Sequence, residues 1–312
     1  MGQKVITKVL KVSDNTKQRM IEYFKFNKRP KTPPYAIFQA DEEDTVVTLY
    51  ESGKVVFQGV SADIDANMWN EIEMNLNGGK SAIVEKKEKT EKTSDEKKIP
   101  LRISSIGSDE VGTGDYFGPI VVTAAYVSRE NVDFLLDLKV KDSKKLSDEQ
   151  IIKIVPEIIK KIPYKTFILS NKEYNKYNSN FNMNKMKAIL HNKVLYQIKS
   201  MGYEYDYIVV DQFENPKSYF NHISDSTKQV KDIFFLTKAE DQCLSVACAS
   251  MISRYIFLSE MNKISKDMGI TIPKGAGPHV DEVGMNIVNI YGKDKLNEIA
   301  KLNFKNTSKI IK

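Results

Sequence analysis

A run of charged side chains divides this 312-residue chain into two parts. Residues 85–98, EKKEKTEKTSDEKK, hold eleven charges in fourteen positions and no apolar side chain. Such a segment cannot bury a hydrophobic core, so we expect it to be a linker. The sequence therefore predicts a small first domain over residues 1–84, the linker over 85–98, and a larger second domain over 99–312.

Composition restricts the class of protein. The chain is 41% hydrophobic and 28% charged, with a mean hydropathy of −0.40, which is typical of a soluble globular protein. No apolar run reaches the ~18–20 residues of a membrane-spanning helix, and the start MGQKVITKVLKV has no signal-peptide core. We therefore expect a cytoplasmic protein with no membrane association. Cys243 and Cys248 suit neither a disulfide framework nor a zinc site, so we expect buried thiols.

The charge balance does not by itself choose a partner. The net charge is +6, and all but five of the 47 basic residues are lysines. Lysine suits phosphate contacts, whereas arginine is the better reader of guanine edges. Lysine abundance is equally compatible with the base composition of the source genome. Residues 1–31 hold nine Lys or Arg against Asp14 and Glu22, which fits a nucleic-acid platform or a plain solvated face.

The first domain is predicted to be a helix on a small antiparallel sheet. Residues 13–29 place Met20, Ile21 and Phe24 on one face of a helix. Three alternating strands follow, separated by the turn-like DEED and ESG: YAIFQA (35–40), TVVTLY (45–50) and KVVFQG (54–59). Four aromatic residues are expected in its core: Tyr35, Phe38, Phe57 and Trp69.

The second domain alternates strands with helices. This pattern predicts an α/β fold with a mixed or parallel central sheet flanked by helices. The expected strands are residues 102–109, 119–127, 165–170, 205–211 and 234–237. The expected helices are residues 131–138, 147–161, 182–201, 240–261 and 281–291. Functional groups in such sheets gather at the ends of strands.

Acidic residues stand at the ends of these elements. Asp109 and Glu110 end the first strand and run into VGTGDYFGP, a loop rich in glycine. Adjacent side chains of a strand point to opposite faces, so the pair can serve one site only if the chain leaves the strand at Glu110, which the glycines permit. Asp211 ends the strand YIVV, and Glu240 or Asp241 begins a long helix. Each alone also fits an ordinary exposed acid, favoured at a helix start by the dipole.

Taken together, the motifs point to a known family. The chain resembles the prokaryotic type 2 ribonucleases H in the order and spacing of four segments: SDEVGTGDYFGPIVV (108–122), KDSKKLS (141–147), VVDQF (209–213) and TKAEDQCLSVACASMISRY (237–255). The sequence GTG followed by Asp-Tyr-Phe-Gly-Pro, and the additional N-terminal domain, resemble ribonuclease HIII within that group. The segment SGKVVFQG (52–59) is similar to part of the TATA-box-binding-protein-like module of ribonuclease HIII.

This resemblance implies both fold and activity. It implies a ribonuclease H-like catalytic domain with a mixed central sheet, and a small α+β TATA-box-binding-protein-like domain that binds substrate. The implied reaction is endonucleolytic hydrolysis of the RNA strand of RNA/DNA hybrids (EC 3.1.26.4) by a two-metal-ion mechanism with Mg²⁺ or Mn²⁺, leaving 5′-phosphate and 3′-hydroxyl ends. Cleavage at single embedded ribonucleotides, as in ribonuclease HII, and a non-catalytic nucleic-acid-binding protein remain as alternatives. We expect a monomer.

The resemblance also assigns catalytic residues. Three carboxylates are expected to bind metal: Asp109, Glu110 and Asp211. The fourth catalytic acid is Glu240 if the Lys-Ala-acid triplet and the downstream Ala-Ser are held in register, or Asp241 if the distance from Asp211 is counted. Of the three histidines at most His279 lies near a motif, so a histidine-based mechanism is not expected.

Substrate contacts are implied for two loops. The Gly-x-Gly loop consists of Gly112, Thr113 and Gly114. Glycine lets the backbone approach a ribose, whose 2′-hydroxyl distinguishes RNA from DNA. The KDSKKLS loop supplies candidates for phosphate contact or for organising the glycine loop: Ser143, Lys144 and Lys145. The end of this motif is also typical of a helix cap, with Ser147 and Gln150. Next to the glycine loop, Tyr116 and Phe117 fit either packing or substrate contact.

Overall fold

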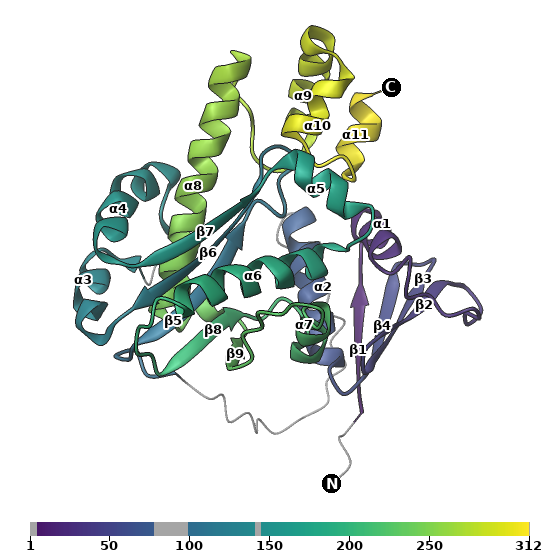
Figure 1. Cartoon of the computed structure of the whole chain (residues 1–312). Coiled ribbons are helices and arrows are strands. Elements are labelled where there is room, and N and C mark those ends of the chain that lie inside the picture. Colours follow the sequence, from purple (N-terminus) through teal and green to yellow (C-terminus); the bar gives the residue numbers. More distant parts are fainter. Residues whose placement is uncertain (1–4, 78–98, 141–144, 312) are drawn as a thin grey trace. The chain divides into compact units, whose positions relative to one another are not determined.

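The computed structural model describes residues 5–77, 99–140 and 145–311 (Figure 1). The chain forms two compact units: Met1–Lys97 with Phe213–His222, and Lys98–Gln212 with Ile223–Lys312. The short segment that follows Asp211 and Gln212 in sequence therefore packs with the N-terminal part of the chain. The predicted linker, residues 85–98, lies outside the described residues, and the domain boundaries placed on it stay a prediction.

The first unit is built on a four-stranded antiparallel sheet. Its elements are β1 (Ile6–Lys11), α1 (Asp14–Tyr23), β2 (Ala36–Glu42), β3 (Thr45–Tyr50), β4 (Lys54–Gly59), α2 (Ala62–Leu76) and, later in the chain, α7 (Pro216–His222). The strand order is β1-β4-β3-β2. One face of the sheet packs with α1 and α2 in a single core that includes Phe38, Phe57 and Trp69.

Several expectations for this unit need correction. The predicted helix over residues 13–29 ends at Tyr23, and β1 and α2 were not predicted. Lysines at exposed positions mask the alternation of β1. Tyr35, expected in the core, is 81% exposed and has a left-handed backbone with φ of 64°. It lies in the turn before β2, where the chain reverses, so its side chain does not reach the core.

The second unit contains a five-stranded mixed sheet. Its strands are β5 (Ser105–Val111), β6 (Ile120–Val127), β7 (Tyr164–Leu169), β8 (Tyr207–Asp211) and β9 (Ile233–Leu236), in the order β7-β6-β5-β8-β9. The pairs β7/β6 and β6/β5 are antiparallel, whereas β5/β8 and β8/β9 are parallel. The predicted α/β class with a mixed sheet is confirmed. Every residue of β6 is buried, which explains why its sequence is apolar except for Thr123, whose hydroxyl pairs with that of Thr166.

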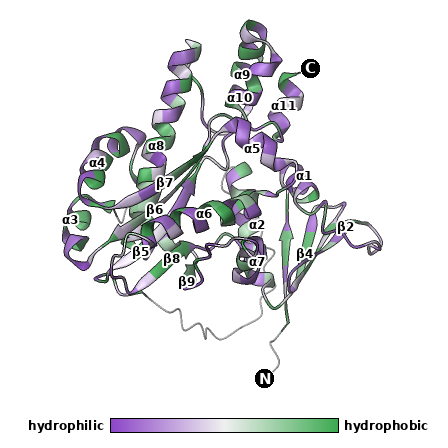
Figure 2. Ribbon diagram, viewed as in Figure 1, coloured by the Kyte–Doolittle hydropathy of each residue, from purple (hydrophilic) through white to green (hydrophobic). Residues whose placement is uncertain are grey.

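Helices cover both faces of this sheet (Figure 1). They are α3 (Val132–Asp137), α4 (Asp148–Lys161), α5 (Asn171–Asn178), α6 (Met183–Lys199), α8 (Leu244–Met268), α9 (Pro278–Tyr291), α10 (Leu296–Ile299) and α11 (Lys305–Ile310). All five predicted helices are present, and α5, α10 and α11 are additional. Figure 2 shows hydrophobic and hydrophilic residues mixed along α4. The buried side of this helix carries Ile151, Val155 and Ile158.

Two other expectations can be checked here. Cys243 and Cys248 are free and buried, as predicted from their spacing. Among the described residues, no helix combines the length and apolar character needed to cross a bilayer.

The start of α8 packs directly on β5. A side chain on Gly107 would place its Cβ 2.4 Å from the Val246 nitrogen and 2.6 Å from the Ser245 carbonyl carbon. The hydroxyls of Ser105 and Ser245 are 2.9 Å apart in the same region. Glycine at position 107 therefore allows the N-terminal turn of α8 to lie against the strand that carries Asp109.

We expect Gly107→Ala to destabilise the second unit by about 1–3 kcal/mol, because the methyl group would overlap backbone atoms that cannot move independently. Gly114→Ala is the matched control, because no atom lies within 4 Å of a Cβ built there. Urea unfolding of both variants measures the difference. Equal stability of the two variants would contradict the close approach of α8 to β5.

Candidate active site

Asp109 and Asp211 are neighbours on two adjacent parallel strands, directly after the last paired residues of β5 and β8. The pairing of β5 with β8 runs in register up to Ser108 and Val210, so the two acids are the next residues on each strand. Equivalent positions on neighbouring strands point to the same face. On that face Ser250 of α8 hydrogen-bonds the Asp109 carboxylate, and the Ala239 amide donates to Asp211 Oδ1 at 2.8 Å. The strand register brings these two predicted residues together.

Glu110 takes a different direction. The chain does not leave the strand at this residue: β5 continues to Val111, and Glu110 pairs with Val122 of β6. Its side chain therefore points to the α6 face, where it forms an ion pair with Lys187 and approaches His191 Nε2 at 2.9 Å. The expected route to a shared site was wrong, yet Glu110 still raises the pKa of Asp211 through its charge.

Lys187 and His191 are the site residues that motif matching missed. His191 is fully buried and joins two residues of β5, because its Nδ1 lies 2.8 Å from the Ser108 hydroxyl. The sequence argued only against a histidine-based mechanism, and it did not anticipate this contact of His191 with Glu110. His279, the one noted from the sequence, is exposed on α9 beside Glu282. The sequence feature that could have indicated them is their i, i+4 spacing on a predicted helix, which places Lys187 and His191 on one helix face.

The carboxylates differ in electrostatic surroundings. Burial opposes ionisation of Glu110, but Lys187 and His191 outweigh it and lower the pKa of Glu110 to about 2. Burial and then the nearby Glu240 raise the pKa of Asp211 to about 6. Burial and then Glu110 raise the pKa of Asp109 well above its usual value. Nearby positive partners thus stabilise the ionised form of Glu110, whereas burial and neighbouring acids disfavour the ionised forms of Asp109 and Asp211.

The fourth acid of the group is better matched by Glu240 than by Asp241. Glu240 lies in a short 3-10 helix, Ala239–Asp241, that precedes α8, and it is only 7% exposed. It is also the largest charged contributor to the raised pKa of Asp211. Asp241 is exposed. Lys238, with φ of 54°, begins this turn in a left-handed conformation.

These carboxylates have the chemistry of a site for a hard divalent cation. They supply only oxygen donors, and cations would relieve the repulsion that raises the pKa values of Asp109 and Asp211. In the described part of the chain, no three His, Cys, Asp or Glu side chains already converge on one ion position. The oxygen donors are therefore of the type that Mg²⁺ or Mn²⁺ binds. The side chains would have to change conformation before three of them could contact one ion.

The two glycines of the glycine loop have different surroundings. Gly112 is buried with φ of 98°, and a Cβ there would lie 2.2 Å from the Pro119 carbonyl oxygen. Gly114 is exposed with nothing near its Cβ position, and Thr113 is half-buried between them. Gly112 therefore makes the turn, and Gly114 offers bare backbone to the solvent.

The aromatic pair beside this loop packs and does not face solvent. Tyr116 and Phe117 are fully buried, with ring centroids 4.8 Å apart. The Tyr116 hydroxyl lies 3.1 Å from that of Thr307 in α11. Of the two roles open from the sequence, substrate contact by this pair is therefore excluded in this conformation.

The KDSKKLS loop is only partly described. Ser143 and Lys144 lie outside the described residues, and Lys145 is exposed. Ser147 and Gln150 form the capping box that begins α4, as the sequence indicated. Arg254 of α8 fastens this end of the loop by donating to the Leu146 carbonyl oxygen at 2.9 Å.

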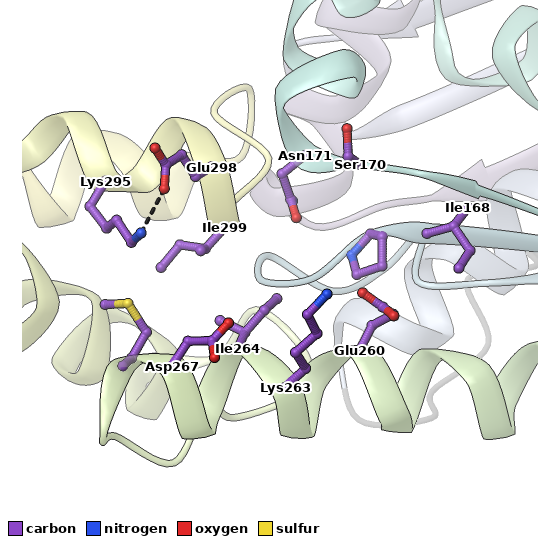
Figure 3. A pocket seen from close by; sticks show the side chains of 12 residues that line it. Ile168, Ser170, Asn171, Glu260, Lys263, Ile264, Asp267, Lys295, Glu298 and Ile299 are labelled. Atoms are coloured by element: carbon purple, nitrogen blue, oxygen red, sulfur yellow. Dashed lines mark hydrogen bonds and ion pairs between the residues drawn. The ribbon is translucent and has the colours of Figure 1, made fainter.

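A separate cavity of about 250 Å³ lies in the same unit (Figure 3). Its lining residues are Pro119, Ile168, Ser170, Asn171, Glu260, Lys263, Ile264, Asp267, Met268, Lys295, Glu298 and Ile299. None of them is a predicted site residue. Lys295 is paired with Glu298, so charges of both signs are mixed on its wall. The cavity is therefore distinct from the carboxylate group.

Comparison with known proteins places the chain in a family. Residues 106–307 match the family described as ribonuclease HII, and residues 7–81 match a domain of unknown function (DUF3378). The chain is 42% identical over 308 residues to ribonuclease HIII of Bacillus velezensis and 41% identical to that of Bacillus subtilis, with 96% of each chain covered. The chain belongs to the ribonuclease HIII family.

Solved structures of the family agree with the fold. The crystal structure of Bst-RNase HIII in complex with Mn²⁺ superposes with a TM-score of 0.68 at 37% identity, covering 98% of both chains. Ribonuclease H2 of Pyrococcus horikoshii, at 25% identity and a TM-score of 0.56, covers 66% of this chain. The match to Bst-RNase HIII over 98% of the chain includes both units of the fold.

The raised pKa of Asp211 predicts a pH-dependent stability. Its value of about 6 exceeds the ~3.9 of an unfolded chain, so folding favours the protonated acid. This contribution is complete below about pH 4 and is lost as the pH rises through 6. In a chelating buffer at pH 8 we therefore expect Asp211→Asn to unfold at a higher temperature than the unmodified protein.

Thermal unfolding at pH 4, 6 and 8 tests this expectation. The advantage of Asp211→Asn should shrink toward pH 4, and the exposed Asp241→Asn should show no such trend. A variant that melts below the unmodified protein at pH 8 would show that Asp211 is not electrostatically strained.

Proposed function

We propose that this chain is an endonuclease that hydrolyses the RNA strand of RNA/DNA hybrids, leaving 5′-phosphate and 3′-hydroxyl ends. The observation that carries this proposal is the pair Asp109 and Asp211 at the ends of in-register strands, in a chain of the ribonuclease HIII family. Two acidic neighbours, Glu110 and Glu240, complete the proposed catalytic set. The activity belongs to the second unit, which contains all four.

Divalent cations are the implied cofactor, and Mn²⁺ is bound in the crystal of Bst-RNase HIII. Asp109, Glu110 and Asp211 would hold Mg²⁺ or Mn²⁺, with Glu240 as the fourth acid. When bound, such ions activate a water molecule and neutralise the charge that develops on the leaving 3′ oxygen.

The side chains of this unit prepare that site. Lys187 and His191 keep Glu110 ionised and fix its direction, as outer partners of metal ligands do. The Ala239 amide orients Asp211, and Ser250 orients Asp109. These interactions hold acids that would otherwise separate by repulsion.

RNA selection is proposed for the glycine loop. Gly114 is exposed and has free space above its Cα, so a ribose can approach the backbone there. Backbone groups at Gly112 to Gly114 can then hydrogen-bond a 2′-hydroxyl, which DNA lacks. Lys145, with Ser143 and Lys144 of the same loop, is proposed to bind backbone phosphates.

The first unit is proposed to grip the hybrid with the open face of its sheet. On this face Lys11 of β1 and Lys54 of β4 are exposed and directly opposite each other. The Lys11 ammonium donates to the Ser52 carbonyl oxygen, and the like charges of Lys11 and Lys54 still repel at opposite positions, which favours an anionic partner for this face. Thr7 and Gln58, also opposite and exposed, extend this polar surface.

The oligomeric state and the cellular compartment are also part of the proposal. A monomer working in the cytoplasm fits an enzyme whose substrate is an RNA/DNA hybrid. The rival activity within the family is cleavage at a single embedded ribonucleotide, and the rival outside it is binding without catalysis.

A cleavage assay separates these activities and tests the fourth acid. With Mg²⁺ or Mn²⁺ we expect the protein to cut a long RNA/DNA hybrid efficiently, and to cut a one-ribonucleotide duplex and double-stranded RNA poorly. Glu240→Gln should lower kcat on the hybrid by at least about 100-fold, because the variant has no charge near the reacting phosphate at this position.

Asp241→Asn is the matched neighbour and should retain nearly full activity. Loss of activity in Asp241→Asn but not in Glu240→Gln would reverse the assignment. Efficient cutting at the single ribonucleotide would favour the rival activity, and hybrid binding without any cutting would favour a pure binder.

Salt dependence tests the platform on the first unit. Replacing Lys11 and Lys54 by Gln should weaken hybrid binding and reduce the slope of log K against log salt by about 2, one for each phosphate that is no longer neutralised. Lys8→Gln is the control, because Lys8 is exposed on the same strand but belongs to the opposite face of the sheet. An unchanged slope in the double variant would remove the open face from the binding surface.

A further inference from the structure

Lys301 is a fully buried lysine in the C-terminal part of the second unit. It follows α10, and its ammonium donates to two backbone carbonyl oxygens of the loop before β6: Asp115 at 2.9 Å and Gly118 at 2.5 Å. Among the described residues, this ammonium has no carboxylate at ion-pair distance. The Lys301 ammonium is thus a hydrogen-bond donor to two main-chain oxygens.

The main chain around Lys301 holds the same loop. The Lys301 amide donates to the Tyr116 carbonyl oxygen at 2.8 Å, and the Gly118 amide donates to that of Ile299 at 2.9 Å. Phe117 and Ala300 form an antiparallel bridge between these bonds. The stretch after the glycine loop is therefore paired with the C-terminal segment like a short strand.

Two other segments reinforce this pairing. Asn171, at the start of α5, donates to the Gly118 carbonyl oxygen at 2.8 Å, and Figure 3 shows it on the wall of the cavity opposite α8. The Gly275 amide donates to Asp115 Oδ1 at 2.6 Å. Gly118 and Asp115 are consequently the points on which three parts of the second unit converge.

The loop held in this way is continuous with the proposed ribose-binding backbone. The Asp115 amide approaches the Gly112 carbonyl oxygen at 3.4 Å and closes the turn that contains Gly114. Gly112 and Gly118 both have positive φ, and Phe257 of α8 lies beneath both. A short, constrained turn therefore connects Asp115 and Gly118 to Gly114.

A buried ammonium is a costly way to fill this space. Burial lowers the pKa of Lys301 to about 7, against an opposing contribution from Asp115. The Tyr174 ring of α5 faces the ammonium at 6.0 Å. An apolar side chain of similar length would avoid the desolvation cost, so packing alone does not explain a lysine here.

We propose that Lys301 is a positioning residue for RNA selection: its ammonium fixes the Asp115 and Gly118 carbonyls and thereby sets the Gly112 to Gly114 backbone for the ribose. This inference rests on the proposed function, because it deepens the role given to the glycine loop. The C-terminal segment is then part of the substrate-selecting apparatus, although it contributes no residue that touches substrate.

The test uses Lys301→Met, which keeps the length and apolar stem and removes the donor. In an Asp211→Asn background, which prevents cleavage, affinities for a hybrid and for a DNA duplex of the same sequence are compared. We expect the hybrid-to-DNA affinity ratio to fall about tenfold, and kcat/KM of Lys301→Met alone on the hybrid to fall similarly. Amide hydrogen exchange across residues 112–118 should accelerate.

Asn306→Ala is the matched control in the same C-terminal segment. Asn306 is buried and donates to the Ala276 carbonyl oxygen at 3.0 Å, so its removal weakens packing without touching Asp115 or Gly118. It should lower the melting temperature but leave the affinity ratio unchanged. If it reduces the ratio as much as Lys301→Met does, the effect is general destabilisation and the proposal is wrong.

Asn171→Ala keeps the proposal testable if Lys301→Met does not fold. It removes a second donor to Gly118 and should change the affinity ratio and hydrogen exchange in the same direction. Unchanged exchange and ratio in a folded Lys301→Met would overturn the inference. Failure of the unmodified protein to cleave any hybrid would instead overturn the proposed function, whereas the exchange measurement would still report on the loop.

Discussion

The in-register parallel pairing of β5 with β8 is the constraint on which the candidate site depends. It places Asp109 and Asp211, more than a hundred positions apart in sequence, side by side on one face of the sheet. The close approach of α8 at Gly107 then brings Ser250 to the Asp109 carboxylate, while the turn before α8 places Glu240 near Asp211. A shift of the register by one residue would put the neighbour of Asp109 on the opposite face from the acid of β8.

The site is electrostatically divided by the two faces of the sheet. Glu110 on the α6 face has Lys187 and His191 as close partners, whereas burial and neighbouring acids dominate the surroundings of Asp109 and Asp211. The first arrangement stabilises an ionised carboxylate in a buried place, and the second leaves repulsion that a cation can relieve. The fold thus holds Glu110 ionised and leaves the repulsion around Asp109 and Asp211 uncompensated by comparably close cations.

Main-chain geometry, more than side chains, shapes the glycine loop. Glycine is required at Gly112 and Gly118 because their backbones are left-handed and pass close to Pro119 and α8. The C-terminal residues around Lys301 then pair with this loop by backbone hydrogen bonds. The segment around Lys301 contains none of the family motifs. It nevertheless supports the glycine loop, which is part of such a motif.

The sequence alone was sufficient for the α/β class, the catalytic acids as candidates and the family, because strand and helix periods and short motifs are local properties. It left Glu240 and Asp241 open, and only the turn before α8 buries the first and exposes the second. It also missed Lys187, His191 and Lys301. Their partners lie far along the chain, so their roles exist only once α6 and the C-terminal segment pack against β5 and its loop.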